Sequence, residues 1–166
     1  AMPGEFQASH FLVAQPFMEV DQPGIQQVAA SLEAEGNDVS KVFDWVHKKI
    51  RNPGYVAQDR GALYALQTGE GDCSEHMYLL ATLLRATGVP ARGIAGFVSS
   101  ESAIVTASEL HNWTEYHDGE KWVGMDSDRG LAVIPPTGYV AMRILEKDSD
   151  YFGDGSQASF GAPPSI

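Results

Sequence analysis

The chain divides into two halves by the spacing of its hydrophobic and polar positions. In the first half apolar residues recur every three to four positions, which is typical of helices with one buried face. This spacing predicts helices over residues 23–35, 39–51 and 60–67, and a fourth that starts at Cys73 and ends before Gly88. In the second half shorter apolar runs predict strands at about 91–98, 112–117, 120–126 and 139–146. Helices followed by strands indicate an α+β domain rather than alternating βαβ units.

The length of 166 residues suits one compact domain with a hydrophobic core. We expect this domain to cover residues 7–150. Residues 1–6 (AMPGEF) resemble a cloning remnant and are left out of the fold argument. Residues 151–166 are rich in Gly, Ser, Ala and Pro, so we expect them to form a flexible C-terminal tail.

The net charge of −11 argues against two classes of partner. A nucleic-acid surface needs clustered Lys and Arg side chains to neutralise phosphates. Here 11 basic residues face 22 acidic ones, and the one tight basic cluster ends a predicted helix, where cations are favourable. No apolar run approaches the roughly 18 residues of a membrane span. We therefore expect no nucleic-acid partner and no membrane contact from this domain.

The single cysteine, Cys73, lies at the predicted start of the fourth helix. A lone cysteine cannot form an internal disulfide, and it is most often a small buried hydrophobic residue. At a helix start, however, unpaired backbone N–H groups and the helix dipole favour the thiolate and lower the thiol pKa. Asp72 is a good N-cap, and Glu75 three residues later predicts a capping box. Because Asp72, Glu75 and Glu70 oppose a thiolate locally, a nucleophilic Cys73 also needs a base.

A candidate base follows from the stretch HNWTEYHDGEKWVGMD at 111–126. Asp118-Gly119 predicts a hairpin with a two-residue turn. In that register His111 faces Asp126, with Cβ atoms ~4.5–5.5 Å apart on one side of the sheet. A carboxylate beside an imidazole fixes its orientation and stabilises its charged form. A single bulge would turn Asp126 to the other face, and Asp128, two residues on, shares its face and competes for the same role.

Three segments together resemble the transglutaminase-like superfamily, and the resemblance spans about residues 14–147. They are IRNPGY at 50–55, GDCSEHMYLLATLLRATGVPARGIAGFV at 71–98, and HNWTEYHDGEKWVGMD at 111–126. The similarity is greatest to the bacterial type often described as cysteine proteases.

The resemblance implies a papain-like core, in which helices that carry the cysteine pack on an antiparallel sheet that carries the histidine and aspartate. It implies a triad of Cys73 as nucleophile, His111 as general acid and base, and Asp126 as the residue that orients His111. The implied chemistry is acyl transfer from amide bonds of a peptide or protein substrate, most simply as a protease or amidase. Tyr55, Asp72 and Trp113 are candidates for the oxyanion site or the cleft around it.

Several alternatives stay open. The same triad would serve a protein-glutamine amine transferase, and the fold can also act as a non-catalytic binding module. A metal site of Cys73, His76, His111 and Asp126 is conceivable, but zinc usually takes three or four dedicated ligands, and we expect no metal and no cofactor. The resemblance favours an extracytoplasmic location, although a single cysteine suits either compartment. Substrate identity and oligomeric state are not predicted.

Overall fold

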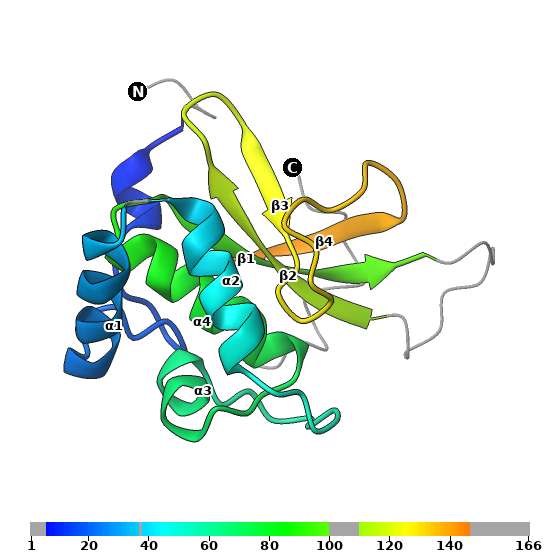
Figure 1. Cartoon of the computed structure of the whole chain (residues 1–166). Helices are drawn as coiled ribbons and strands as arrows, with labels where there is room; N and C mark the ends of the chain where they lie inside the picture. The colour runs from blue at the N-terminus through cyan, green and yellow to red at the C-terminus, as the bar shows by residue number, and fades with distance from the viewer. Residues whose placement is uncertain (1–5, 37, 100–109, 147–166) are drawn as a thin grey trace.

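The computed structural model describes residues 6–36, 38–99 and 110–146, in which helices precede a four-stranded antiparallel sheet (Figure 1). The helices are the short 3-10 helix η1 (Ala8–Phe11), α1 (Pro23–Ala34), α2 (Val39–Lys49), α3 (Ala62–Thr68) and α4 (Cys73–Ala86). The strands are β1 (Ala91–Val98), β2 (Leu110–His117), β3 (Trp122–Met125) and β4 (Tyr139–Leu145). The predicted α+β class is confirmed. Apart from Phe6, the expected cloning remnant and the expected tail lie outside the described residues.

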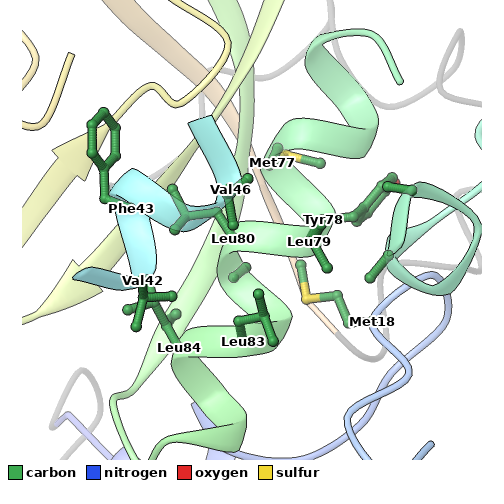
Figure 2. Packing of buried hydrophobic residues seen from close by; sticks show 14 of the residues in the cluster. Met18, Val42, Phe43, Val46, Met77, Tyr78, Leu79, Leu80, Leu83 and Leu84 are labelled. Atoms are coloured by element: carbon green, nitrogen blue, oxygen red, sulfur yellow. The ribbon is translucent and has the colours of Figure 1, made fainter. Parts of the chain in front are cut away.

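Helix α4 is the centre of the fold. It packs against α1, α2 and α3 and, on another side, against β1 and β2, so every residue from Ser74 to Arg85 is buried. Figure 2 shows leucines of α4 meeting Val42 and Val46 of α2 in the main apolar cluster. Each such buried side chain contributes about 1.5–3 kcal/mol relative to an exposed one. None of the helices in the described ranges is long and apolar enough to cross a membrane. The core therefore holds the start of α4, and Cys73 with it, in a fixed place.

The sheet has the strand order β3-β2-β1-β4 (Figure 1). The close approach of α4 to β1 depends on Gly93, because a Cβ there would lie 2.8 Å from the Met77 sulfur. On β2 the Thr114 hydroxyl donates to the Met77 backbone carbonyl at 3.0 Å. These contacts fix β2, which carries His111, relative to α4, which carries Cys73.

The register of the β2–β3 hairpin differs from the predicted one by two residues. His117 pairs with Trp122 instead of Glu120, so the turn contains four residues, 118–121. The Asp118 carboxylate accepts the backbone N–H groups of Glu120 and Lys121 at 2.8 and 2.9 Å and so stabilises this longer turn. An even shift keeps each side chain on its predicted face, whereas a shift of one would have reversed it.

Candidate active site

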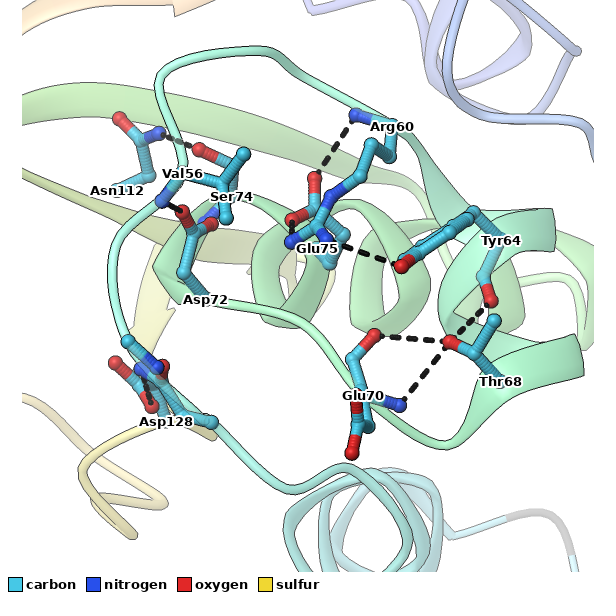
Figure 3. Close-up of polar contacts among 12 residues, drawn as sticks. Val56, Arg60, Tyr64, Thr68, Glu70, Asp72, Ser74, Glu75, Asn112 and Asp128 are labelled. Atoms are coloured by element: carbon cyan, nitrogen blue, oxygen red, sulfur yellow. Dashed lines mark hydrogen bonds and ion pairs between the residues drawn. The ribbon is translucent and has the colours of Figure 1, made fainter.

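Cys73 is the first residue of α4 and is partly exposed. Asp72 caps the helix as predicted: its Oδ1 accepts the Ser74 N–H at 2.9 Å. Its Oδ2 accepts the Val56 N–H at the same distance, which ties the preceding loop to the helix start (Figure 3). Asp72 is thus held as a hydrogen-bond acceptor by two backbone groups, and this fixes the geometry around the cysteine.

Glu75 does not complete the predicted capping box. Its carboxylate is fully buried and binds Arg60 instead, through the guanidinium at 2.8 Å and the Arg60 backbone N–H at 3.1 Å (Figure 3). A charge-assisted pair with two donors is a stronger partner for a buried carboxylate than one helix amide. Arg60 therefore joins the loop before α3 to the first turn of α4.

Asn112, on β2, brings the thiol and the histidine together. Its side-chain amide donates to the Ser74 hydroxyl at 2.8 Å (Figure 3), and its backbone N–H acts to lower the pKa of the Cys73 thiol. His111 immediately precedes Asn112 on β2, so the Asn112–Ser74 bond holds the start of α4 next to the strand that carries His111. Cys73 and His111 line one cavity of about 530 Å³. Spacing along the sequence could not supply this link between helix and strand.

His111 also makes the predicted contact with Asp126. Its Nε2 lies 2.7 Å from Asp126 Oδ2, and both side chains are buried. The hairpin shift makes these residues diagonal rather than directly opposed, a separation that long side chains still bridge. Nε2 is engaged by the carboxylate, so Nδ1 is the ring nitrogen that this contact leaves free.

Asp126 is itself held from two further sides. The Tyr139 hydroxyl donates to its Oδ2 at 2.7 Å, and the Arg129 backbone N–H donates to its Oδ1 at 3.1 Å. Burial alone would raise the pKa of Asp126, but the hydrogen bond and charge of His111, with Tyr139 and Arg129, bring that pKa below its ordinary value. Asp126 is therefore an ionised, oriented carboxylate at neutral pH.

The thiol itself has a raised pKa. Burial raises the pKa of Cys73 to about 11; the Asn112 N–H opposes this rise, while the charges of Asp72, Asp128 and Asp126 add to it. Burial therefore outweighs the lowering of the Cys73 pKa that the position at the helix start predicts. A nucleophilic thiolate at neutral pH requires that the thiol proton move to a neighbouring base.

The other predicted site residues occupy different surroundings. Tyr55 is 81% exposed and lines the cavity, as does Asp72. Trp113 is 2% exposed and packs its ring against those of His111 and Tyr139. Within the part of the chain that the structure describes, no three His, Cys, Asp or Glu side chains are grouped as a metal site would require.

Three contributors were missed from the sequence. Tyr139 begins a predicted strand, and nothing in its spacing indicates that its hydroxyl reaches Asp126. Asn112 has no role in the sequence analysis, whereas in the structure its side chain binds Ser74 at the start of α4. Asp128 was expected to compete with Asp126, but it accepts the Asn52 side chain at 2.9 Å and lines the cavity. Each of these contacts joins elements that lie far apart along the chain.

Comparison with known proteins gives one family and a few relatives. The sequence profile described as Transglutaminase-like superfamily matches residues 25–127. A curated relative, "Protein-glutamine gamma-glutamyltransferase" from Pseudomonas aeruginosa, is 29% identical over an alignment of 106 positions that covers 55% of this chain and 14% of that protein. The chain thus spans only a small part of this relative's length.

One solved structure supports the fold. A "Putative Cysteine Protease" from Cytophaga hutchinsonii superposes with a TM-score of 0.69 at 19% identity, covering 90% of this chain and 51% of that one. The periplasmic domain of TgpA from Pseudomonas aeruginosa gives a TM-score of 0.49 at 22% identity, covering 66% of this chain and 45% of that one. The first of these has the same arrangement of helices and antiparallel sheet over nearly the whole chain.

Proposed function

This chain belongs to the transglutaminase-like superfamily, and we propose that it is a cysteine-dependent enzyme that cleaves amide bonds of peptides or proteins. Cys73 is the nucleophile, His111 the general base and acid, and Asp126 the residue that orients His111 and stabilises its charged form. The observation that carries the proposal is that Cys73 and His111 line one cavity while a buried carboxylate holds the far nitrogen of that imidazole at 2.7 Å.

The reaction runs in two halves. The Cys73 proton moves to His111, and the thiolate attacks the amide carbonyl. The oxyanion that forms is stabilised by backbone N–H groups at the start of α4, with Cys73 N–H as the first donor. His111 then gives its proton to the leaving amine, the C–N bond breaks, and a thioester remains. In the second half His111 takes a proton from water, the hydroxide attacks the thioester, and the C–S bond breaks to release the carboxylic acid; His111 then returns its proton to the Cys73 thiolate.

Hydrolysis is favoured because the cavity is open at its margin. Tyr55 is 81% exposed and Leu110 is 43% exposed, and both line the cavity with Cys73. Water therefore reaches the thioester without any rearrangement. The side-chain contribution to the oxyanion site stays a prediction, with Tyr55 as the candidate that borders the reacting centre.

Transfer of the acyl group to an amine is the second candidate. It is supported by the curated relative named a protein-glutamine gamma-glutamyltransferase, whose matched segment is 29% identical to this chain. The same thioester serves both reactions, and the product depends on whether water or an amine attacks it.

The activation of Cys73 can be tested by its alkylation with iodoacetamide as a function of pH. Because Cys73 is the only cysteine, the label reports one thiol. We expect the wild-type protein to react near neutral pH. His111→Ala should react only as the pH approaches about 11, since that is the thiol pKa set by burial, so the rate at pH 7 should fall at least about 100-fold. His117→Ala, at the other end of the same strand, should react like the wild type.

An unchanged pH profile in His111→Ala would contradict the proposed triad. The two candidate reactions separate when a glutamine-containing peptide is incubated with a fluorescent primary amine. Release of ammonia or a shorter peptide without label supports hydrolysis, and incorporation of the label supports transfer. If neither occurs with any peptide and Cys73→Ser retains the biological activity, the domain is a binding module.

A further inference from the structure

Asp128 is a carboxylate in the cavity that the proposed reaction does not use. It lines the cavity with Cys73 and His111, and its side chain is only 15% exposed. Its Oδ1 accepts the Asn52 side-chain amide at 2.9 Å, as the dashed line at Asp128 in Figure 3 shows. Among the described residues, Oδ2 has no hydrogen-bond partner. One oxygen is thus anchored and the other is left for a ligand.

The groups around Asp128 leave its charge largely uncompensated. His76 Nε2 lies 3.7 Å from Asp128 Oδ1, but burial lowers the pKa of His76, which favours the neutral ring. Arg129 also lines the cavity, and its Nε lies 3.9 Å from the Asp126 carboxylate. Asp128 is only partly exposed, so solvent compensates its charge less completely than it would that of a surface carboxylate. A cationic group of a substrate that enters the cavity can supply the remaining compensation.

The charge of Asp128 reaches the reacting centre. Its charge is one of three carboxylate charges that raise the pKa of the Cys73 thiol. Burial raises that pKa most, and the Asn112 backbone N–H acts in the opposite direction. A cation bound at Asp128 would therefore lie close to the thioester. Tyr55 and Leu110, which also line the cavity, offer apolar contact for the methylene groups of a long basic side chain. The cavity thus combines a carboxylate with apolar surface, the two features that a lysine or arginine side chain needs.

We propose that Asp128 is a specificity-determining residue that selects substrates with a basic side chain beside the reacting amide. The inference rests on the proposed function of the same site, but the recognition step needs no turnover and can be measured separately. The basic side chain is bound, not transformed: its ammonium or guanidinium group pairs with Asp128 while Cys73 attacks the neighbouring carbonyl.

The test compares two blocked pentapeptides, each with a central glutamine. One has lysine on both sides of the glutamine, and the other has norleucine, which keeps the methylene groups of lysine but lacks its charge. Binding of both peptides is measured by NMR titration of the Cys73→Ala protein, and turnover by product release from the wild type. In the Cys73→Ala background we expect the lysine peptide to bind about ten-fold more tightly than the norleucine peptide.

Three further variants make the test specific. Asp128→Asn keeps an acceptor for Asn52 but removes the charge, so the ratio of the two affinities should fall to about one. Asp128→Glu keeps the charge and should retain a preference for lysine. Asp44→Asn removes a charge from the exposed face of α2, so it should leave the ratio as it was; an equal loss there would assign the preference to the overall charge of −11 and overturn the inference.

The remaining outcomes are equally decisive. A lysine preference that survives Asp128→Asn, or no lysine preference in the Cys73→Ala protein, overturns the inference about Asp128. If the lysine peptide binds in an Asp128-dependent way but is never turned over, the inference stands and the proposed enzymatic function fails. If both peptides are turned over at rates that Asp128→Asn does not change, the proposed enzymatic function stands and the inference about Asp128 fails.

Discussion

The pair of Arg60 and Glu75 offers a quantitative test of how α4, which begins at Cys73, is anchored. The Glu75 side chain is fully buried two residues after Cys73, and its nearest cation is the Arg60 guanidinium at 2.8 Å. Arg60→Ala removes this cation and leaves a carboxylate in the core. The Arg60 backbone N–H, at 3.1 Å from the other carboxylate oxygen, remains as a donor.

The size of the effect follows from burial. Removing one partner of a buried ion pair costs about 3–5 kcal/mol, because the other charge is left without compensation. The remaining backbone donor, and the 21% exposure of the Arg60 side chain, place the expected loss in unfolding free energy at the lower end, about 3 kcal/mol. Arg51 is the matched control: it pairs with Glu70, but its side chain is 69% exposed, so Arg51→Ala should cost about 0–1 kcal/mol.

The measurement is urea unfolding followed by tryptophan fluorescence for both single variants. A third protein, Arg60→Ala with Glu75→Gln, replaces the stranded charge by a neutral amide and should recover at least about half of the loss. Equal and small losses for Arg60→Ala and Arg51→Ala would refute the argument that burial of Glu75 makes this pair important. The argument would also be refuted if the double variant were no more stable than Arg60→Ala.

Three further results are expected. Tyr139→Phe removes the hydroxyl that fixes the Asp126 carboxylate, and the loss of orientation should outweigh the small gain in carboxylate basicity, lowering kcat/KM about ten-fold. Tyr78→Phe removes a similar bond to an aspartate, at 2.8 Å and away from the site, and should leave kcat/KM unchanged. Gly96→Ala would place a Cβ 2.1 Å from a backbone carbonyl of β4, so urea unfolding should show a loss of about 2–3 kcal/mol. Because the pKa of Asp126 is lowered by folding, its stabilising effect is present above its unfolded value near 3.9 and is lost as the pH falls toward the lower folded value. The stability difference between wild type and Asp126→Asn, from urea unfolding at pH 3 to 7, should therefore shrink below about pH 4.

The order and type of the elements could be predicted because they depend on local patterns. The apolar spacing of α1 and α2, and the strong N-cap at Asp72, each specify a local structure whatever surrounds it. The capping box failed for the opposite reason. Glu75 has the right spacing for the Asp72 amide, but Arg60 is brought to it by the tertiary fold and is the better partner. The capping-box rule failed because Glu75 pairs with a charged residue from another part of the fold, and spacing along the sequence cannot predict that contact.

The candidate site was predictable to the extent that it lies on one hairpin. The contact of His111 with Asp126 survives an incorrect register, because a shift of two residues preserves the face and leaves a diagonal pair within reach. Tyr139 and Asn112 could not be predicted in the same way. Tyr139 approaches Asp126 from β4, and Asn112 binds Ser74 of α4, so both contacts depend on how separate elements pack.

The raised pKa of Cys73 explains why the orientation of His111 should matter so much. A lone thiolate in this cavity is opposed by burial and by three carboxylates, one of which is Asp126. Once the proton moves to His111, the same carboxylate meets a cation at 2.7 Å. Coulomb energies fall with distance, so the attraction between Asp126 and a charged His111 ring at 2.7 Å is strong. In the proposed reaction Asp126 therefore disfavours a thiolate without its imidazolium and favours the two together, so nucleophilic reactivity is expected only in the state in which His111 is already charged.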